Sequence, residues 1–161
     1  MQVVTMGTKL TKKLTYDATA EQVAAMLDDV AFREEVLARQ KVARGSASID
    51  GDHVTIEQVR SSDGLPSFAQ KFVGDEIVIV QKETWTSPTS ADVHLAIPGK
   101  PGEAAGTLTL TEAGGTTTEV VQLDVSVRIP LVGGKVEGLI KDMVGTALDI
   151  EHRVGQEWLA R

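Results

Sequence analysis

Few residues of this chain have the types and spacings that enzymes or metal sites require. The three histidines, His53, His94 and His152, are far apart in the sequence, and none belongs to an HxH or HxxxH pair of metal ligands. The chain has no cysteine, which excludes thiol nucleophiles, disulfides and thiolate metal sites. It also lacks the GxSxG motif of serine hydrolases and the GxxxxGKS/T motif of phosphate-binding loops. The sequence therefore predicts no catalytic residue, no metal site and no cofactor.

Ionisable side chains inside apolar strands are the other candidates for chemistry. In the two-residue period of their strands, Lys12, Glu57 and Glu83 each share a face with apolar side chains. Each could therefore face the protein interior. His94 lies on the face opposite its apolar neighbours and is expected to point outward. A charge inside an apolar space needs a partner or a ligand group. The alternative, which we favour at this point, is that strand twist or a bulge carries these charges to the rim of the sheet.

Composition narrows the classes of partner. The net charge is −7, from 16 Lys and Arg against 23 Asp and Glu, and aromatic residues make up only 4% of the chain. Such a surface repels nucleic-acid phosphates and offers few rings on which bases stack, so no nucleic-acid partner is expected. No apolar run approaches the roughly 20 residues that span a bilayer, and the first residues lack the pattern of a signal peptide. We therefore expect a cytoplasmic protein without stable membrane insertion.

The elements that position these residues follow from sequence periodicity. Residues 8–16 predict a strand, and Thr19 with Gln22 forms a capping box that predicts the start of a helix. A second short helix is expected over about residues 32–40. Between residues 42 and 129, short segments with a period of two alternate with turn signals such as Asp50–Gly51. Consecutive strands joined by short turns form antiparallel hairpins.

Two helical segments interrupt or follow these strands. In "LPSFAQKFVGD", residues 65–75, Phe68 and Phe72 have helical spacing, with Pro66 near the start and Gly74 after the end. From about residue 131, an apolar stripe at steps of three and four residues predicts one long helix, and only the sheet offers a broad enough partner surface. The order predicts an α+β fold. A curved antiparallel sheet of about seven strands surrounds the long C-terminal helix, with two short helices after the first strand.

The passage from the last strand to the long helix, "RIPLVGGKVEGLI", carries a resemblance to a known superfamily. Together with "LPSFAQKFVGDEI" and "ETW", it resembles the START-like (SRPBCC) superfamily, whose members have the helix-grip fold. Within that superfamily it is most similar to an actinobacterial group of uncharacterised proteins. The resemblance implies a single START-like domain over residues 8–161, after a loose N-terminal segment of residues 1–7. START-like proteins include carriers, cyclases, hydrolases and chaperone cofactors, so the fold alone does not select an activity.

The resemblance also implies an elongated cavity between the sheet and the long helix. We expect inward-facing side chains to line it as ligand-binding residues: Leu14, Trp85, Leu95, Leu108, Leu123, Val125, Met143, Ala147 and Ile150. Trp85 could instead plug the end of the sheet. The helix with Phe68 and Phe72 is expected to act as a gate at the cavity mouth, and the alternative is a satellite cluster packed on the sheet edge.

Functions of different classes remain open. The absence of catalytic motifs favours a binding or carrier protein for a hydrophobic or amphipathic small molecule, lipid-like or polyketide-like. The alternative is a cyclase- or dehydratase-type enzyme that uses acid–base residues of the same cavity, with Lys12, Glu57, Glu83 and His94 as the only candidates. A third reading is a core filled by side chains, with function at the surface.

Three glycines lie together on the polar face of the long helix: Gly134, Gly138 and Gly145. An interior glycine costs a helix about 1 kcal/mol relative to alanine. These glycines could let a second copy approach closely in a homodimer, or weaken the helix so that it shifts as the cavity fills. They could also be exposed positions at which glycine is tolerated.

Overall fold

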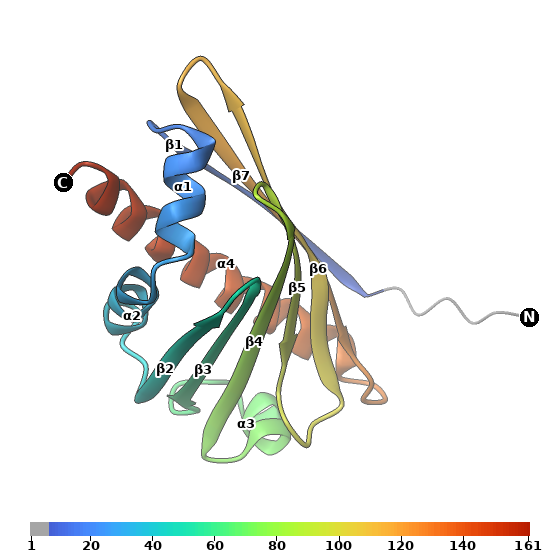
Figure 1. Ribbon diagram of the computed structural model, residues 1–161. Helices are drawn as coiled ribbons and strands as arrows, with labels where there is room; N and C mark the ends of the chain where they lie inside the picture. The colour runs from blue at the N-terminus through green and yellow to red at the C-terminus, as the bar shows by residue number, and fades with distance from the viewer. Residues whose placement is uncertain (1–6) are drawn as a thin grey trace, which may run out of the picture.

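The computed structural model describes residues 7–161, so the predicted loose segment 1–7, apart from Gly7, lies outside the described residues. Within this range the elements follow the predicted order. Their bounds are β1 Thr8–Tyr16, α1 Ala20–Leu27, α2 Val30–Arg39, β2 Arg44–Asp50, β3 His53–Ser61, α3 Ser67–Val73, β4 Glu76–Ser87, β5 Ser90–Ala96, β6 Gly102–Ala113, β7 Thr116–Val127 and α4 Gly133–Leu159. Figure 1 shows a curved sheet with the long helix α4 lying along one side of it.

The strands form one antiparallel sheet in the order β1-β7-β6-β5-β4-β3-β2, so the first strand pairs with the last. The two-residue alternation explains which face is buried. In β7, Val121, Leu123 and Val125 are buried, whereas Gln122 and Asp124 on the other face are exposed. The predicted α+β fold with a sheet of about seven strands around a C-terminal helix is therefore confirmed.

The two short helices α1 and α2 close one end of the sheet (Figure 1). The predicted capping box starts α1: Thr19 Oγ1 accepts a hydrogen bond from the backbone of Gln22 at 3.2 Å, and Gln22 Oε1 accepts one from the backbone of Thr19 at 2.9 Å. Asp29 caps α2 by accepting from the backbone N–H of Ala31 at 2.9 Å. These hydrogen bonds fix the residues at which both helices begin.

The long helix α4 is fastened at its start to the end of the sheet. It begins at Gly133, slightly later than expected, after Leu131 has taken a left-handed φ of +73°. A Cβ atom at Gly133 would lie 2.5 Å from the carbonyl oxygen of Val127, so the close approach requires glycine. Glu137 then accepts hydrogen bonds from Val127 N and Thr8 Oγ1, both at 2.9 Å.

From this start, α4 leans toward one half of the sheet. Its closest backbone contacts with strands are those with β1 and β7. The inner faces of β3, β4 and β5 are therefore covered less closely, and the cavities described below lie on that side. Within residues 7–161, no helix is both long and apolar enough to cross a membrane.

Candidate functional site beneath the C-terminal helix

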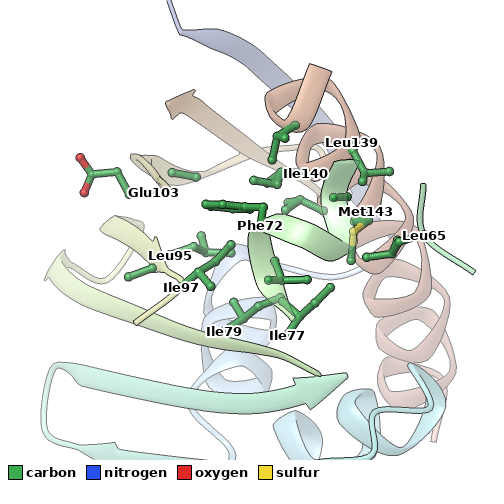
Figure 2. A pocket seen from close by; sticks show the side chains of 16 residues that line it. Leu65, Phe72, Ile77, Ile79, Leu95, Ile97, Glu103, Leu139, Ile140 and Met143 are labelled. Atoms are coloured by element: carbon green, nitrogen blue, oxygen red, sulfur yellow. The ribbon is translucent and has the colours of Figure 1, made fainter. Parts of the chain in front are cut away.

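An apolar cavity of about 60 Å³ lies between α3, α4 and the inner faces of β4 and β5. Leu139 and Ile140 of α4 face Ile77 and Ile79 of β4 across it, and Phe72 of α3 projects between them (Figure 2). These residues point inward because the alternation of β4 and the helical spacing of α3 and α4 place them there. Glu103 also borders this cavity, but its carboxylate points away from the other lining side chains (Figure 2) and contacts His94. The remaining lining is apolar, and its chemistry is that of a site for an apolar chain.

A polar cavity of about 80 Å³ adjoins the apolar one, between α2, β3, β4 and α4. Apolar side chains share its lining with amide, guanidinium and carboxyl side chains: Arg33, Gln40, Gln58, Arg60, Gln81 and Glu151. The two cavities share four lining side chains, Ile79, Leu95, Met143 and Val144. The space beneath α4 therefore changes from apolar to polar along the helix.

A third, inner cavity of about 30 Å³ lies deeper, toward β6 and β7. It shares Gln81, Leu148 and Glu151 with the polar cavity, and Glu83 and Glu119 also line it. A water molecule needs roughly 10–15 Å³ of such space, so each cavity holds a few waters at most.

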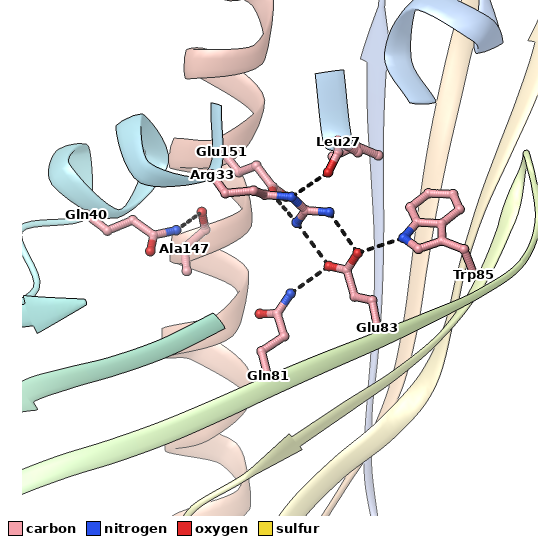
Figure 3. A network of polar contacts seen from close by, with 8 residues as sticks. All are labelled: Leu27, Arg33, Gln40, Gln81, Glu83, Trp85, Ala147 and Glu151. Atoms are coloured by element: carbon pink, nitrogen blue, oxygen red, sulfur yellow. Dashed lines mark hydrogen bonds and ion pairs between the residues drawn. The ribbon is translucent and has the colours of Figure 1, made fainter. Parts of the chain in front are cut away.

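Figure 3 shows a buried ion pair between Arg33, which lines the polar cavity, and Glu83, which lines the inner cavity. The guanidinium of Arg33 donates to both carboxylate oxygens of Glu83, at 2.7 and 3.0 Å, and its Nε donates to the backbone oxygen of Leu27 at 2.8 Å. Gln81 and Trp85 also donate to Glu83, at 2.8 and 3.1 Å. Every oxygen of Glu83 is thus satisfied, which a buried carboxylate requires.

Two further carboxyl groups, those of Glu151 and Glu119, lie near this ion pair and have fewer polar partners than Glu83. Glu151 lies 3.6 Å from Arg33, and burial raises the pKa of Glu151 to about 6 although Arg33 opposes the shift. Glu119 is fully buried, and no hydrogen-bond partner contacts its carboxyl oxygens within the described residues. Burial, reinforced by Glu151, raises the pKa of Glu119 well above its usual range. Burial therefore favours the protonated form of the Glu119 carboxyl.

Tyr16 completes the buried cluster. Its hydroxyl has no hydrogen-bond partner among the described residues, and burial followed by the charge of Glu119 raises its pKa. In the part of the chain that the structure describes, no group of three His, Asp or Glu side chains is placed to hold a metal ion. The cluster can donate or hold protons, but it offers no metal centre.

Comparison with known proteins places this chain in a family. Residues 11–159 match the model of a family described as a protein of unknown function, DUF2505. The chain belongs to this family. A curated relative is the uncharacterized protein Rv0481c of Mycobacterium tuberculosis, 30% identical over 124 residues, which are 71% of this chain and 70% of Rv0481c. The predicted relationship to uncharacterised actinobacterial proteins is thus confirmed.

Solved structures similar to this DUF2505 protein have the START-like fold. The Zhui aromatase/cyclase from Streptomyces sp. R1128 has a TM-score of 0.68 at 10% identity, over 96% of this chain and 94% of that one. A START superfamily protein from Mycobacterium smegmatis has a TM-score of 0.59 at 14% identity, over 94% and 97%. At such identities the likeness shows the fold alone, and the predicted helix-grip fold is confirmed.

The residues predicted to line a single cavity are divided in the DUF2505 structure. Leu95 lines all three cavities, Met143 lines two of them, and Ala147 lines the polar one. Leu108 and Leu123 line the inner cavity. The remaining predicted residues border none of the three: Leu14 and Val125 are buried in the solid core, Ile150 packs against it half-buried, and Trp85 borders a separate groove while it donates to Glu83.

Of the four acid–base candidates, the structure brings only Glu83 to the cavities. The expectation that strand twist carries Glu83 to the sheet rim is wrong: Glu83 is buried, and Arg33 compensates its charge there. Glu57 faces solvent, since Gln58 rather than Glu57 lies on the inner face of β3. Lys12 reaches Asp149 of α4 at 2.7 Å, and His94 lies outside as predicted, 2.9 Å from Glu103.

Sequence reasoning missed Arg33, Glu119 and Glu151, although each lies on a predicted apolar face. Glu119 continues the inward alternation of β7 by one more step before Val121. Glu151 stands one turn after Ala147 on α4, and Arg33 one turn before Leu37 on α2. The positional signal was present for all three. The sequence did not reveal which charged side chains would meet, because the three residues come from segments far apart in the chain.

Proposed function

We propose that this DUF2505 protein binds and carries a small amphipathic molecule in the space beneath α4. The observation that carries this proposal is the direct adjacency of the apolar and polar cavities, which share Ile79, Leu95, Met143 and Val144 as a common wall. An amphipathic ligand would place its apolar body beside Phe72 and its polar end among the glutamines. Ligand sites of this kind are mostly apolar with a few placed polar groups.

The size of the cavities requires the protein to open when it binds. They measure about 60 and 80 Å³, whereas typical ligand sites span about 300–1,000 Å³. The shared wall includes Met143, whose flexible side chain changes rotamer more readily than a branched one. A ligand that displaces this wall would join the two cavities into one elongated site.

We propose helix α3 as the gate of this site. Phe72 lines the apolar cavity on one side and an outer hollow on the other, and Phe68 lines only the outer hollow. The helix has seven residues and no side-chain N-cap, so little local energy holds it in place. Rotation of Phe72 would therefore connect the apolar cavity with solvent.

Native mass spectrometry tests the carrier function. Protein purified from its own cells without detergent should carry a bound small-molecule mass. Ile140→Trp fills the apolar cavity and should abolish that mass together with uptake of the neutral dye Nile red. Val78→Trp, at an exposed position of β4, is the matched control and should change neither.

Equal occupancy in wild type and Ile140→Trp would refute the proposal. Absence of both the bound mass and the dye in the wild type would support the filled-core reading.

The buried carboxyl groups favour a second candidate function, an acid–base enzyme acting in the same space. Glu151, with a pKa raised to about 6, and Glu119, with a pKa raised well above its usual range, both line the inner cavity. Two carboxyl groups whose environments separate their protonation states are the arrangement that general acid–base catalysis uses. Glu83 would hold Arg33 rather than react, because its oxygens are fully engaged.

Deuterium exchange separates the enzyme from the carrier. The recovered ligand is returned to the protein in D₂O, and after brief return to H₂O to remove deuterium from O–H and N–H groups, mass spectrometry follows the deuterium that is bound to its carbon atoms. An enzyme that moves protons should label it, and Glu119→Gln should stop labelling while binding persists. A carrier should leave the ligand unlabelled in both proteins.

A further inference from the structure

We propose that the ligand of this protein is a single-chain amphiphile with an anionic head group, and that the guanidinium of Arg60 binds this head. The inference rests on the proposed carrier function, because it names the chemical class of the molecule that the cavities hold. It arises from the polar cavity, in which one cation stands without a carboxylate partner.

Arg60 is positioned by the alternation of β3. The inner face of this strand continues from the buried Val54 and Ile56 through Gln58 to Arg60, which is half-buried and lines the polar cavity. Within residues 7–161, no carboxylate forms an ion pair with Arg60, whereas Arg33 in the same cavity is paired with Glu83 and Glu151. Burial lowers the pKa of Arg60, and no neighbouring acid opposes this shift. The half-buried guanidinium is thus partly desolvated without a countercharge among the described residues, and an anion would supply one.

Two amide oxygens hold the guanidinium in a defined orientation. Its Nε donates to Gln58 Oε1 at 2.7 Å, and its Nη2 donates to Gln40 Oε1 at 3.3 Å. Gln40 is itself fixed, because its Nε2 donates to the backbone oxygen of Ala147 on α4 at 3.1 Å. A guanidinium has five N–H donors, so about three remain for an incoming oxyanion. A carboxylate or phosphate accepts such donors as parallel, charge-assisted hydrogen bonds.

The apolar cavity beside the polar one indicates which kind of group is attached to the anionic head of the ligand. The polar cavity adjoins the apolar one through Ile79 and Met143, and the apolar cavity ends at Phe72 of the gate. A head group at Arg60 would thus send its chain toward α3 past the mostly apolar lining of this cavity. Only one apolar cavity adjoins the polar one among the described residues, so we infer one chain rather than the paired chains of a membrane lipid.

Calorimetric titration of the full-length protein with three twelve-carbon probes tests the inference. The probes are dodecanoate, dodecyl phosphate and uncharged 1-dodecanol, and they are compared in wild type, Arg60→Gln and Arg153→Gln. Arg153 lies exposed on α4, so its variant removes the same charge outside the cavities. Arg60→Lys, which keeps the charge without the planar fork, is the second cavity variant.

We expect at least one anionic probe to bind the wild type roughly tenfold to hundredfold more tightly than 1-dodecanol, as hydrogen bonds to a charged group imply. Arg60→Gln should lose this preference and keep the 1-dodecanol affinity, and Arg60→Lys should keep part of the preference. Arg153→Gln should match the wild type. The ratio of dodecanoate to dodecyl phosphate affinity then distinguishes a carboxylate head from a phosphate head.

The contrary results separate the two proposals. If 1-dodecanol binds and neither anion binds more tightly, the anionic head group is refuted and the carrier function stands. An undiminished preference in Arg60→Gln would likewise refute the role of Arg60. If no probe binds any variant, the carrier function falls and this inference falls with it. Retained 1-dodecanol binding by Arg60→Gln, with an unchanged melting temperature, shows that the variant is folded.

Discussion

At the scale of single residues, the buried carboxyl groups differ in how many polar partners surround them. The carboxylate of Glu83 accepts hydrogen bonds from three side chains, whereas that of Glu119 has no partner among the described residues. Burial is similar for both, and each side chain is almost fully covered. The difference lies in Arg33, whose own pKa is raised by Glu83 and Glu151 despite the opposing effect of burial.

Replacement of Glu119 by glutamine should stabilise the protein increasingly as pH rises. The folded carboxyl keeps its proton above the ordinary pKa of 4.5, whereas the unfolded chain releases it there, so the unfolded state gains stability with pH. The wild type should lose about 1.4 kcal/mol of unfolding free energy per pH unit through this group, beginning near pH 4.5 and ending at the raised pKa. Glu119→Gln removes this loss.

Chemical denaturation from pH 4.5 to pH 8 measures the effect. The unfolding free energies of wild type and Glu119→Gln should be close at pH 4.5 and diverge above it, with the variant more stable at pH 8. Asp124→Asn, at an exposed position of the same strand, should show no such divergence. Parallel curves for Glu119→Gln and wild type would mean that Glu119 is ionised in the folded protein.

Replacement of Glu83 by glutamine should be among the more damaging single changes. It leaves the buried Arg33 with only Glu151, 3.6 Å away, as an anionic partner. Loss of one member of a buried pair costs about 3–5 kcal/mol of unfolding free energy, and we expect the lower end because Glu151 remains. Thermal unfolding gives the value. Glu157→Gln, which breaks the exposed pair with Arg39, should leave the melting temperature nearly unchanged.

The contrast between Glu57 and Glu83 shows what the sequence could not decide. Both glutamates alternate with apolar residues, yet Glu57 is exposed and Glu83 is buried. In β3 both sets of alternate residues contain apolar side chains, so the pattern alone does not identify the inner face. The register of strand pairing identifies the inner face, because a shift of one residue would move every side chain to the opposite face of the sheet. Glu57 pairs with Val80, and Gln58 with Ile79 of the inner face.

At the scale of elements, periodicity predicted the strands and helices well because each has one buried face. The capping box of Thr19, the turns and the stripe of α4 are local signals, and all appear in the structure. The division of the interior into three cavities is not local. It depends on how far α4 leans toward β1 and β7, which no single segment encodes.

Two alanine substitutions within α4 should have opposite effects. A Cβ atom at Gly155 would lie 2.7 Å from Cε1 of the buried Tyr16, so Gly155→Ala should destabilise the protein by about 1–3 kcal/mol. Nothing lies within 4 Å of the corresponding atom at Gly138, so Gly138→Ala should stabilise it by about 1 kcal/mol. Urea denaturation compares the two.

The same Gly138→Ala variant tests the predicted homodimer. If α4 packs against a second copy through this face, the added methyl group should weaken the dimer in analytical ultracentrifugation. An unchanged mass with a gain in stability would indicate that glycine is merely tolerated there. A loss of stability in Gly138→Ala would contradict the open surroundings of this position.

At the scale of the whole molecule, ligand binding should appear as a gain in global stability. A ligand that binds only the folded state, present at 100 times its dissociation constant, adds about 2.7 kcal/mol. For a domain of this size that corresponds to roughly 5–10 °C in melting temperature. Differential scanning calorimetry with the tightest of the twelve-carbon probes should show this rise in wild type and not in Ile140→Trp. An equal rise in both would place the binding site elsewhere.

The tilt of α4 toward β1 and β7 has a consequence for how such a protein can diversify. One half of the interior is solid and carries the packing that holds the chain together, with Leu14 and Val125 almost completely enclosed. The other half, around Phe72 and Met143, is loosely filled. Substitutions at half-buried positions of this half, such as Met143, should therefore remove less packing than substitutions at Leu14 or Val125. Recognition could change at such positions while the solid half keeps the chain folded.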